Sequence, residues 1–253
     1  MTRPGEPCLG ARHADLSFGG YASRSMGDFG LYLAFMIPPL LIGLGVQAWL
    51  KRTFAKYSSV EISSGLPGAQ VARQILDRNG LHEVPVEISP GGALSDHYDP
   101  RKKALFLSEP VYAPPTIAAA AVAAHETGHA LQDSRGYVPL RIRSAIYPAV
   151  AFASTAWIWL LLIGAVLGAL NLVALALLLY AVAVAFHIVT LPVEFNASRR
   201  AAGQLRELGL VGPTESEGVQ RVLTAAAFTY VAGTLAALSL LLYYALVFFG
   251  NRD

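Results

Sequence analysis

Three long apolar runs without a charged residue limit what this chain can fold into. Residues 29–50, 144–193 and 222–251 contain no Asp, Glu, Lys or Arg. A helix needs about 20 predominantly apolar residues to cross a bilayer, so the outer runs hold one span each and the middle run holds two. Gly164, Gly168 and Asn171 mark the turn inside the middle run. We therefore expect four transmembrane helices: one at 29–50, a hairpin of two at 146–191, and one at 224–250.

The composition supports a mainly α-helical integral membrane protein. Hydrophobic residues make up 54% of the 253 residues and charged residues only 14%, against about 25% charged residues in a typical soluble domain. Residues 1–28 are rich in Gly, Ser and Arg and are expected to be disordered. The apolar run after them is too long for a signal peptide and no A-x-A-like cleavage site follows it, so we interpret it as an anchor.

Positive charge predicts the orientation of these helices. Segments 51–145 and 192–223 carry 15 of the 19 Lys and Arg residues, and four spans place both segments on the same side. Lys and Arg accumulate in cytoplasmic loops, so we expect this side to be cytoplasmic. No basic patch interleaved with aromatic residues indicates nucleic-acid binding. The single Cys8 excludes an internal disulfide framework and a Cys-rich zinc site.

The clearest chemical motif is H-E-x-x-H at residues 125–129. His125 and His129 stand four residues apart and share a helix face, where both imidazoles can reach one metal ion. Glu126 can then accept a proton from a water on that metal. In an apolar helix these polar groups need partners, and zinc is the expected one. Helix signals surround the motif at 114–116, 118–124 and 134–136.

One residue of the motif does not favour a helix. Gly128 in a helix interior costs about 1 kcal/mol relative to Ala. We therefore expect another element to pack closely against this turn.

A catalytic zinc takes three protein ligands and a water, so the motif requires one further ligand. Glu194 is the first acidic residue after the 144–193 run, where the chain is expected to re-emerge on the side of the motif. The 65 residues from His129 to Glu194 fit a transmembrane hairpin. We therefore predict that Glu194 is the third metal ligand. The alternative is an ordinary acid at a helix end, paired with Arg199.

Residues 51–145 are predicted to form a small α+β unit between the first and second spans. Apolar spacing predicts a helix at 66–78, and alternation predicts strands at 84–88 and 103–108 with a turn or hairpin at 89–92. This order, with the H-E-x-x-H helix last, is the minimal arrangement of a zincin-like catalytic domain. An edge strand before that helix can hold an extended peptide. Residues 192–223 would form the segment that supplies the third ligand.

Peptide hydrolysis also needs a donor for the developing oxyanion. His97 and Tyr98 are the first candidates, and the alternative is that the polar cluster around them only shapes a turn. Tyr230 and Arg199 are further candidates. His187 lies inside the predicted third span, so we expect it to hydrogen-bond a neighbouring helix rather than to bind metal.

Four motifs together resemble the YugP family of bacterial neutral zinc metallopeptidases. They are HETGH at 125–129, DHYDPRKK at 96–103, LPVEFNASRRA at 191–201 and AAAFTYVAGTL at 225–235. The resemblance covers about residues 29–249. It implies an integral-membrane, zinc-dependent peptidase of the bacterial cytoplasmic membrane.

A more distant similarity concerns the third ligand. Residues 194–198 are similar to the E-F-x-A-D element of HtpX-type membrane proteases, and this similarity implies the ligand role for Glu194. Ser198 stands where those proteases have Asp, a residue that steadies a zinc-bound His. Ser198 or Asn196 would supply a neutral hydrogen bond instead.

Together these features predict a membrane-embedded zinc metallopeptidase in which Glu126 activates the attacking water. Its expected partners are a membrane-associated protein or peptide substrate and the lipid bilayer. One alternative is a zinc-binding scaffold or adaptor without hydrolysis. A transporter or channel is a second, although the spans lack the charged residues typical of a transport pathway. Intramembrane proteolysis is a third, although Asp133, Arg135 and Arg141 after the motif indicate an interfacial location.

Overall fold

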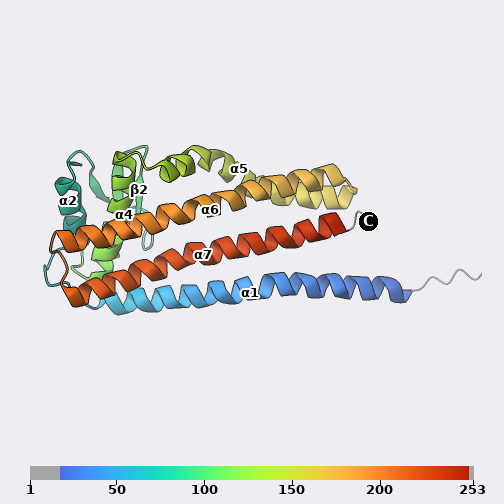
Figure 1. Cartoon of the computed structure of the whole chain (residues 1–253), viewed down its shortest axis with the longest axis horizontal. Helices are drawn as coiled ribbons and strands as arrows, with labels where there is room; N and C mark the ends of the chain where they lie inside the picture. Colours follow the sequence, from blue (N-terminus) through green and yellow to red (C-terminus); the bar gives the residue numbers. More distant parts are fainter. Residues whose placement is uncertain (1–17, 251–253) are drawn as a thin grey trace, which may run out of the picture.

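Four long helices dominate the structure. The computed structural model describes residues 18–250, and the side chains of residues 29–250. Within this range the long helices are α1 (Phe18–Ser58), α5 (Val138–Leu167), α6 (Leu170–Glu207) and α7 (Pro213–Gly250). They run side by side along the long axis of the molecule (Figure 1). Each is long and apolar enough to cross a membrane, as the apolar runs predict.

The helices extend beyond the apolar runs that predict them. Helices α6 and α7 have 38 residues each, which at 1.5 Å per residue is about 57 Å, against about 30 Å for the hydrocarbon core. Residues 192–223 are therefore no separate segment: α6 continues through Pro192 to Glu207, and α7 begins at Pro213. Adding residues to a formed helix costs far less than nucleating one, so good helix formers beyond the apolar run continue it.

Helix α1 also begins before the apolar run that predicts it. This helix begins at Phe18, so residues 18–28 are helical, where the sequence predicts disorder. They extend a helix that the apolar run nucleates. The rest of the expected disordered tail, residues 1–17, lies outside the described residues.

The turn between α5 and α6 lies where the glycines predict it. Helix α5 ends at Leu167, and Gly168 takes a left-handed conformation with φ of 62°, which favours glycine. A Cβ on Gly164 would lie 3.0 Å from the Val173 backbone nitrogen. Small residues at this point therefore let the two arms of the hairpin cross closely.

The chain between α1 and α5 folds as an α+β unit at one end of the helices (Figure 1). Its elements are α2 (Gly68–Arg78), β1 (Val86–Ile88), β2 (His97–Asp99), β3 (Ala104–Leu107), α3 (Glu109–Tyr112) and α4 (Ile117–Ser134). The strand order is β1-β3-β2, with β1 parallel and β2 antiparallel to β3. The two predicted strands thus pair in parallel rather than as a hairpin. The hairpin is β2–β3, and β2 is too short and polar for alternation to reveal it.

Helix α4 lies at the centre of this unit. The Thr116 hydroxyl accepts a hydrogen bond from the Ala119 N–H and caps the helix. Alanines at 118–121 are fully buried, and their small side chains let α4 approach its neighbours closely. One hydrophobic core joins α4 to α2, α6 and α7, and a second joins it to α2 and the sheet. The H-E-x-x-H helix is therefore held from both sides.

Candidate active site

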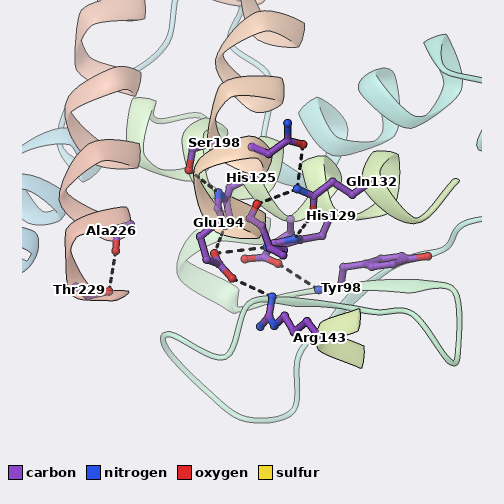
Figure 2. A network of polar contacts seen from close by, with 12 residues as sticks. Tyr98, His125, His129, Gln132, Arg143, Glu194, Ser198, Ala226 and Thr229 are labelled. Carbon is purple, nitrogen blue, oxygen red and sulfur yellow. Dashed lines mark hydrogen bonds and ion pairs between the residues drawn. The ribbon is translucent and has the colours of Figure 1, made fainter. Parts of the chain in front are cut away.

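Helices α4 and α6 bring the three predicted metal ligands together. His125 and His129 project from α4, and Glu194 projects from α6 (Figure 2). Nε2 of His125 lies 3.2 Å from Oε2 of Glu194, and Nε2 of His129 lies 3.7 Å from the same oxygen. One ligand atom from each residue lies within 4.8 Å of the other two. Two imidazoles and a carboxylate thus face one point from two helices.

Gly128 makes this approach of the two helices possible. A Cβ on Gly128 would lie 2.6 Å from the carbonyl oxygen of Ala197 on α6. The expectation that another element packs against this turn is confirmed, and the element is the helix that carries Glu194. The residue that weakens α4 as a helix thus permits its backbone to touch α6.

Each imidazole has a second partner on its other ring nitrogen. Nδ1 of His125 lies 3.1 Å from Oγ of Ser198, and Nδ1 of His129 lies 3.0 Å from Oε1 of Gln132. The Gln132 amide donates to the Val193 carbonyl at 2.8 Å and to Oδ1 of Asn196 at 3.1 Å. These contacts fix the rings with Nε2 toward Glu194 (Figure 2). Ser198 and Asn196 both take part, Asn196 through Gln132.

The Glu194 carboxylate is 1% exposed and has a cationic partner that sequence reasoning missed. Nη1 of Arg143 on α5 donates to Oε1 of Glu194 at 2.9 Å, and the Tyr230 phenol on α7 also interacts with Glu194. The only signal for Arg143 in the sequence is its place just before the 144–193 run. Arg199, the partner considered from the sequence, lines a different pocket.

The Glu126 carboxylate lies beside the cluster. Its Oε2 accepts a hydrogen bond of 3.2 Å from the backbone N–H of Tyr98 on β2. Burial is the main cause that raises the pKa of Glu126, to about 7; the charge of Glu194 acts in the same direction and His125 in the opposite one. A carboxyl group with a pKa near neutrality can both accept and return a proton.

A cleft of about 460 Å³ gives access to these groups. Glu126, His129 and Glu194 line it, together with β2, the first turns of α5 and Tyr230. Strand β2 is an edge strand, and its pairing partner β3 lies on the other side.

Two predicted oxyanion donors, His97 and Tyr98, line the cleft but are held by other partners. The His97 ring stacks on Phe106, with centroids 4.9 Å apart. The Tyr98 phenol donates to Oδ2 of Asp133 at 2.8 Å. His187 is not part of the His125, His129 and Glu194 cluster. Its ring contacts the adjacent Phe186, and among the described residues it makes no hydrogen bond to a neighbouring helix, contrary to expectation. An imidazole can stay neutral in such apolar surroundings without a partner.

Sequence comparison identifies the family. A family described as “Putative neutral zinc metallopeptidase” matches residues 32–249. The chain belongs to this family. It is also 47% identical over 223 residues to the “Putative membrane protease YugP” of Bacillus subtilis (strain 168), an alignment that covers 88% of this chain and 99% of that protein. No solved structure matches the chain. The resemblance to YugP is therefore confirmed.

The residues present fit the zinc of a zinc metallopeptidase. Two His nitrogens and one carboxylate oxygen are a donor set that catalytic zinc sites use, with a fourth position left for water. The carboxylate is almost fully buried, and both Nε2 atoms face it with their Nδ1 atoms already occupied. A cation between these three atoms would neutralise the buried charge of Glu194, which Arg143 also contacts. His125, His129 and Glu194 are therefore the residues in the described chain that could hold the zinc.

Proposed function

We propose that this membrane protein is a zinc-dependent endopeptidase in which His125, His129 and Glu194 hold the metal and Glu126 is the general base. The observation that carries the proposal is the convergence of three ligand atoms within 4.8 Å beside Glu126 in one cleft. Zinc, when bound, lowers the pKa of a coordinated water to about 7 and polarises a carbonyl group.

Glu126 carries the proton transfers. Its carboxylate accepts a proton from the attacking water and returns it to the amine of the leaving peptide. The Tyr98 backbone N–H holds one carboxylate oxygen and leaves the other free for this exchange. A pKa of about 7 lets the same group act as base and then as acid near neutral pH. Tyr98 thus contributes to the site through its backbone.

Arg143 and Tyr230 are the donors best placed for the oxyanion. Both line the cleft next to Glu194, Arg143 from α5 and Tyr230 from α7. Arg143 uses one N–H on Glu194, and a guanidinium has five. A second N–H is thus available for charge that develops on the substrate. His97 also lines the cleft but has a lesser role here, because its ring stacks on Phe106.

The walls of the cleft suit an extended segment of a membrane-associated protein. Edge strand β2 offers backbone groups on one side, as in other peptide-binding sites. On the other side α5, which leads into the membrane, lines the cleft with the apolar side chain of Leu140 and with Tyr147, which is 56% exposed. The Lys and Arg residues gathered on this side support a cytoplasmic location for the site in the bacterial membrane.

A zinc-binding scaffold without hydrolysis is the main alternative. A scaffold needs only the residues that bind its zinc. It does not need an additional carboxyl group that lies beside the zinc without binding it. Glu126 is such a group: it lies in the cleft and is absent from the ligand cluster. Its burial next to Glu194 carries an electrostatic cost, as its raised pKa shows, and general-base catalysis accounts for that cost.

Two variants of the detergent-purified protein test the proposal. We would measure bound zinc and cleavage of casein or a membrane protein for wild type, Glu126→Gln and Glu194→Ala. Wild type should hold one zinc and cleave, Glu126→Gln should hold zinc without cleaving, and Glu194→Ala should lose zinc. A Glu126→Gln protein that cleaves like wild type would refute the assigned base. A wild-type protein that binds zinc but cleaves no substrate would favour the scaffold.

A further inference from the structure

A second pocket lies between α6 and α7, outside the active-site cleft. Its volume is about 280 Å³. Arg199 and Arg206 line it, and no acidic residue does so among the described residues. The rest of its lining is polar or apolar: Phe195, Ser198, Ala202, Gln220, Leu223, Thr224 and Ala227.

The two arginines of this pocket have no partner within the described chain. Arg199 and Arg206 are exposed, and the side chain of neither makes an ion pair or hydrogen bond with another described residue. Arg200, which lies between them, behaves differently because it donates to Oδ1 of Asn196 at 2.7 Å. The positive charge of the pocket is thus available to an anion from outside.

Polarity changes along the pocket in one direction on both helices. On α6, Phe195 precedes Arg199 and Arg206, which lie farther from the apolar run that ends at Val193. On α7, Gln220 precedes the apolar run and Ala227 lies inside it. The two helices are antiparallel (Figure 1), so both turn their polar residues away from the membrane and their apolar residues toward it.

An aromatic pair lies at the level of the apolar end of the pocket. Trp49 on α1 meets Phe228 on α7 with ring centroids 5.6 Å apart, and the two side chains are 40% and 41% exposed. Aromatic residues gather at the level of the lipid headgroups. Ala227, at the apolar end of the pocket, is the neighbour of Phe228 in the chain. The cationic end therefore lies just on the aqueous side of this level, where lipid phosphates are found.

We propose that this pocket binds the phosphate-bearing headgroup of an anionic phospholipid from the leaflet next to the α+β unit. The arginines contact the phosphate, Gln220 and Thr224 contact the polar part of the headgroup, and the chain of the lipid leaves along Phe195 and Ala227. An acidic peptide would satisfy the arginines but not the apolar end. Basic pockets between membrane helices are known to suit such headgroups.

Ser198 connects this pocket with the proposed zinc site. It lines the pocket, and its Oγ lies 3.1 Å from Nδ1 of His125. If the Ser198 hydroxyl donates its hydrogen to a lipid phosphate, its oxygen can only accept a hydrogen bond from His125. The Nδ1–H of His125 then donates to Oγ of Ser198, and this bond fixes the ring. This connection rests on the proposed role of His125 as a ligand, whereas the lipid site itself does not.

Native mass spectrometry of the delipidated full-length protein tests the lipid site without zinc or cleavage. Phosphatidylglycerol, phosphatidylcholine and inorganic phosphate are added in turn to wild type and to the Arg199→Gln/Arg206→Gln double variant. Wild type should bind phosphatidylglycerol about tenfold more tightly than phosphatidylcholine, and the double variant should lose this preference. The Arg78→Gln/Arg141→Gln variant is the control, because it removes the same charge from exposed positions outside the pocket. It should keep the preference.

Several results would overturn the proposal. Equal phosphatidylglycerol binding by wild type and the Arg199→Gln/Arg206→Gln protein would exclude the pocket. If the Arg78→Gln/Arg141→Gln control lost the preference for phosphatidylglycerol to the same extent, the preference would come from general surface charge and not from the pocket. Competition by inorganic phosphate at concentrations equal to the lipid would make free phosphate the ligand, and displacement of the lipid by an acidic peptide would make it a protein site. Failure of the zinc proposal would change none of these measurements.

Discussion

The carbonyl oxygen of Ala197 lies where a side chain on Gly128 would have to be: a Cβ there would be 2.6 Å from it. Helices α4 and α6 therefore touch backbone to backbone, one turn from Glu194. This contact sets the spacing between the two imidazoles and the carboxylate, which come from distant parts of the sequence.

Replacement of Gly128 by Ala should separate the two helices. Overpacking of a tight contact costs about 1–3 kcal/mol, more than the gain in helix propensity of about 1 kcal/mol. We expect a lower melting temperature and less bound zinc. Gly233→Ala in α7 is the control, because a Cβ there meets nothing within 4 Å. A Gly128→Ala protein that melts and binds zinc like wild type would show that the contact is not needed.

Replacement of Gln132 by Ala should weaken zinc binding. Gln132 is fully buried and is the partner of Nδ1 of His129, and loss of such a partner typically lowers metal affinity about 10- to 100-fold. Competition with a chromophoric chelator would measure the affinity. Gln74→Ala on the exposed face of α2 should leave it unchanged. If Gln132→Ala bound zinc with unchanged affinity, the Gln132 amide would serve only to hold α4 and α6 together.

Replacement of Tyr98 by Phe should leave catalysis nearly intact. Burial and the Asp133 carboxylate raise the pKa of the phenol, so the phenol stays protonated and donates to Asp133 rather than to a substrate. We expect a loss of about 1 kcal/mol in stability and little change in kcat. Loss of a direct oxyanion donor would instead lower kcat about 100- to 1,000-fold. A fall in kcat of that size in Tyr98→Phe would show that the Tyr98 phenol does donate to the oxyanion.

Replacement of Arg143 by Gln should lower kcat without releasing the metal. The guanidinium donates directly to Glu194 from the wall of the cleft, and its loss should cost about 100-fold or more in kcat with little change in KM. Arg141→Gln, two residues earlier on the exposed side of α5, is the matched control. Zinc content must be measured on the same samples. A parallel fall in bound zinc would show that Arg143 acts by holding Glu194 in position.

The parts of the structure that depend on local sequence could be predicted. The four long helices follow from uncharged runs, the bounds of α4 from its capping Thr116 and terminal Gly136, and the α5–α6 turn from Gly168. The close packing at Gly128 follows from the cost of glycine in a helix. Each of these signals lies within a few residues of the feature that it predicts.

Features that depend on tertiary contacts could not be predicted. Arg143 is 51 residues from Glu194 in the chain, and the Tyr98 phenol finds Asp133 across 35 residues. Which way such side chains turn is decided by elements that the sequence does not place relative to one another. Strand β2 has only three residues and is held by its pairing with β3, so its own residues carry little strand signal.

The α5–α6 hairpin that separates His129 from Glu194 has a consequence for biosynthesis. Two ligands are synthesised before the hairpin and the third only as its second arm is completed, so the donor set is split until both arms have entered the bilayer. A nascent or wrongly inserted chain therefore carries only two of the three proposed zinc ligands. The proposed proteolytic activity would in this way be withheld from unfinished copies of the chain.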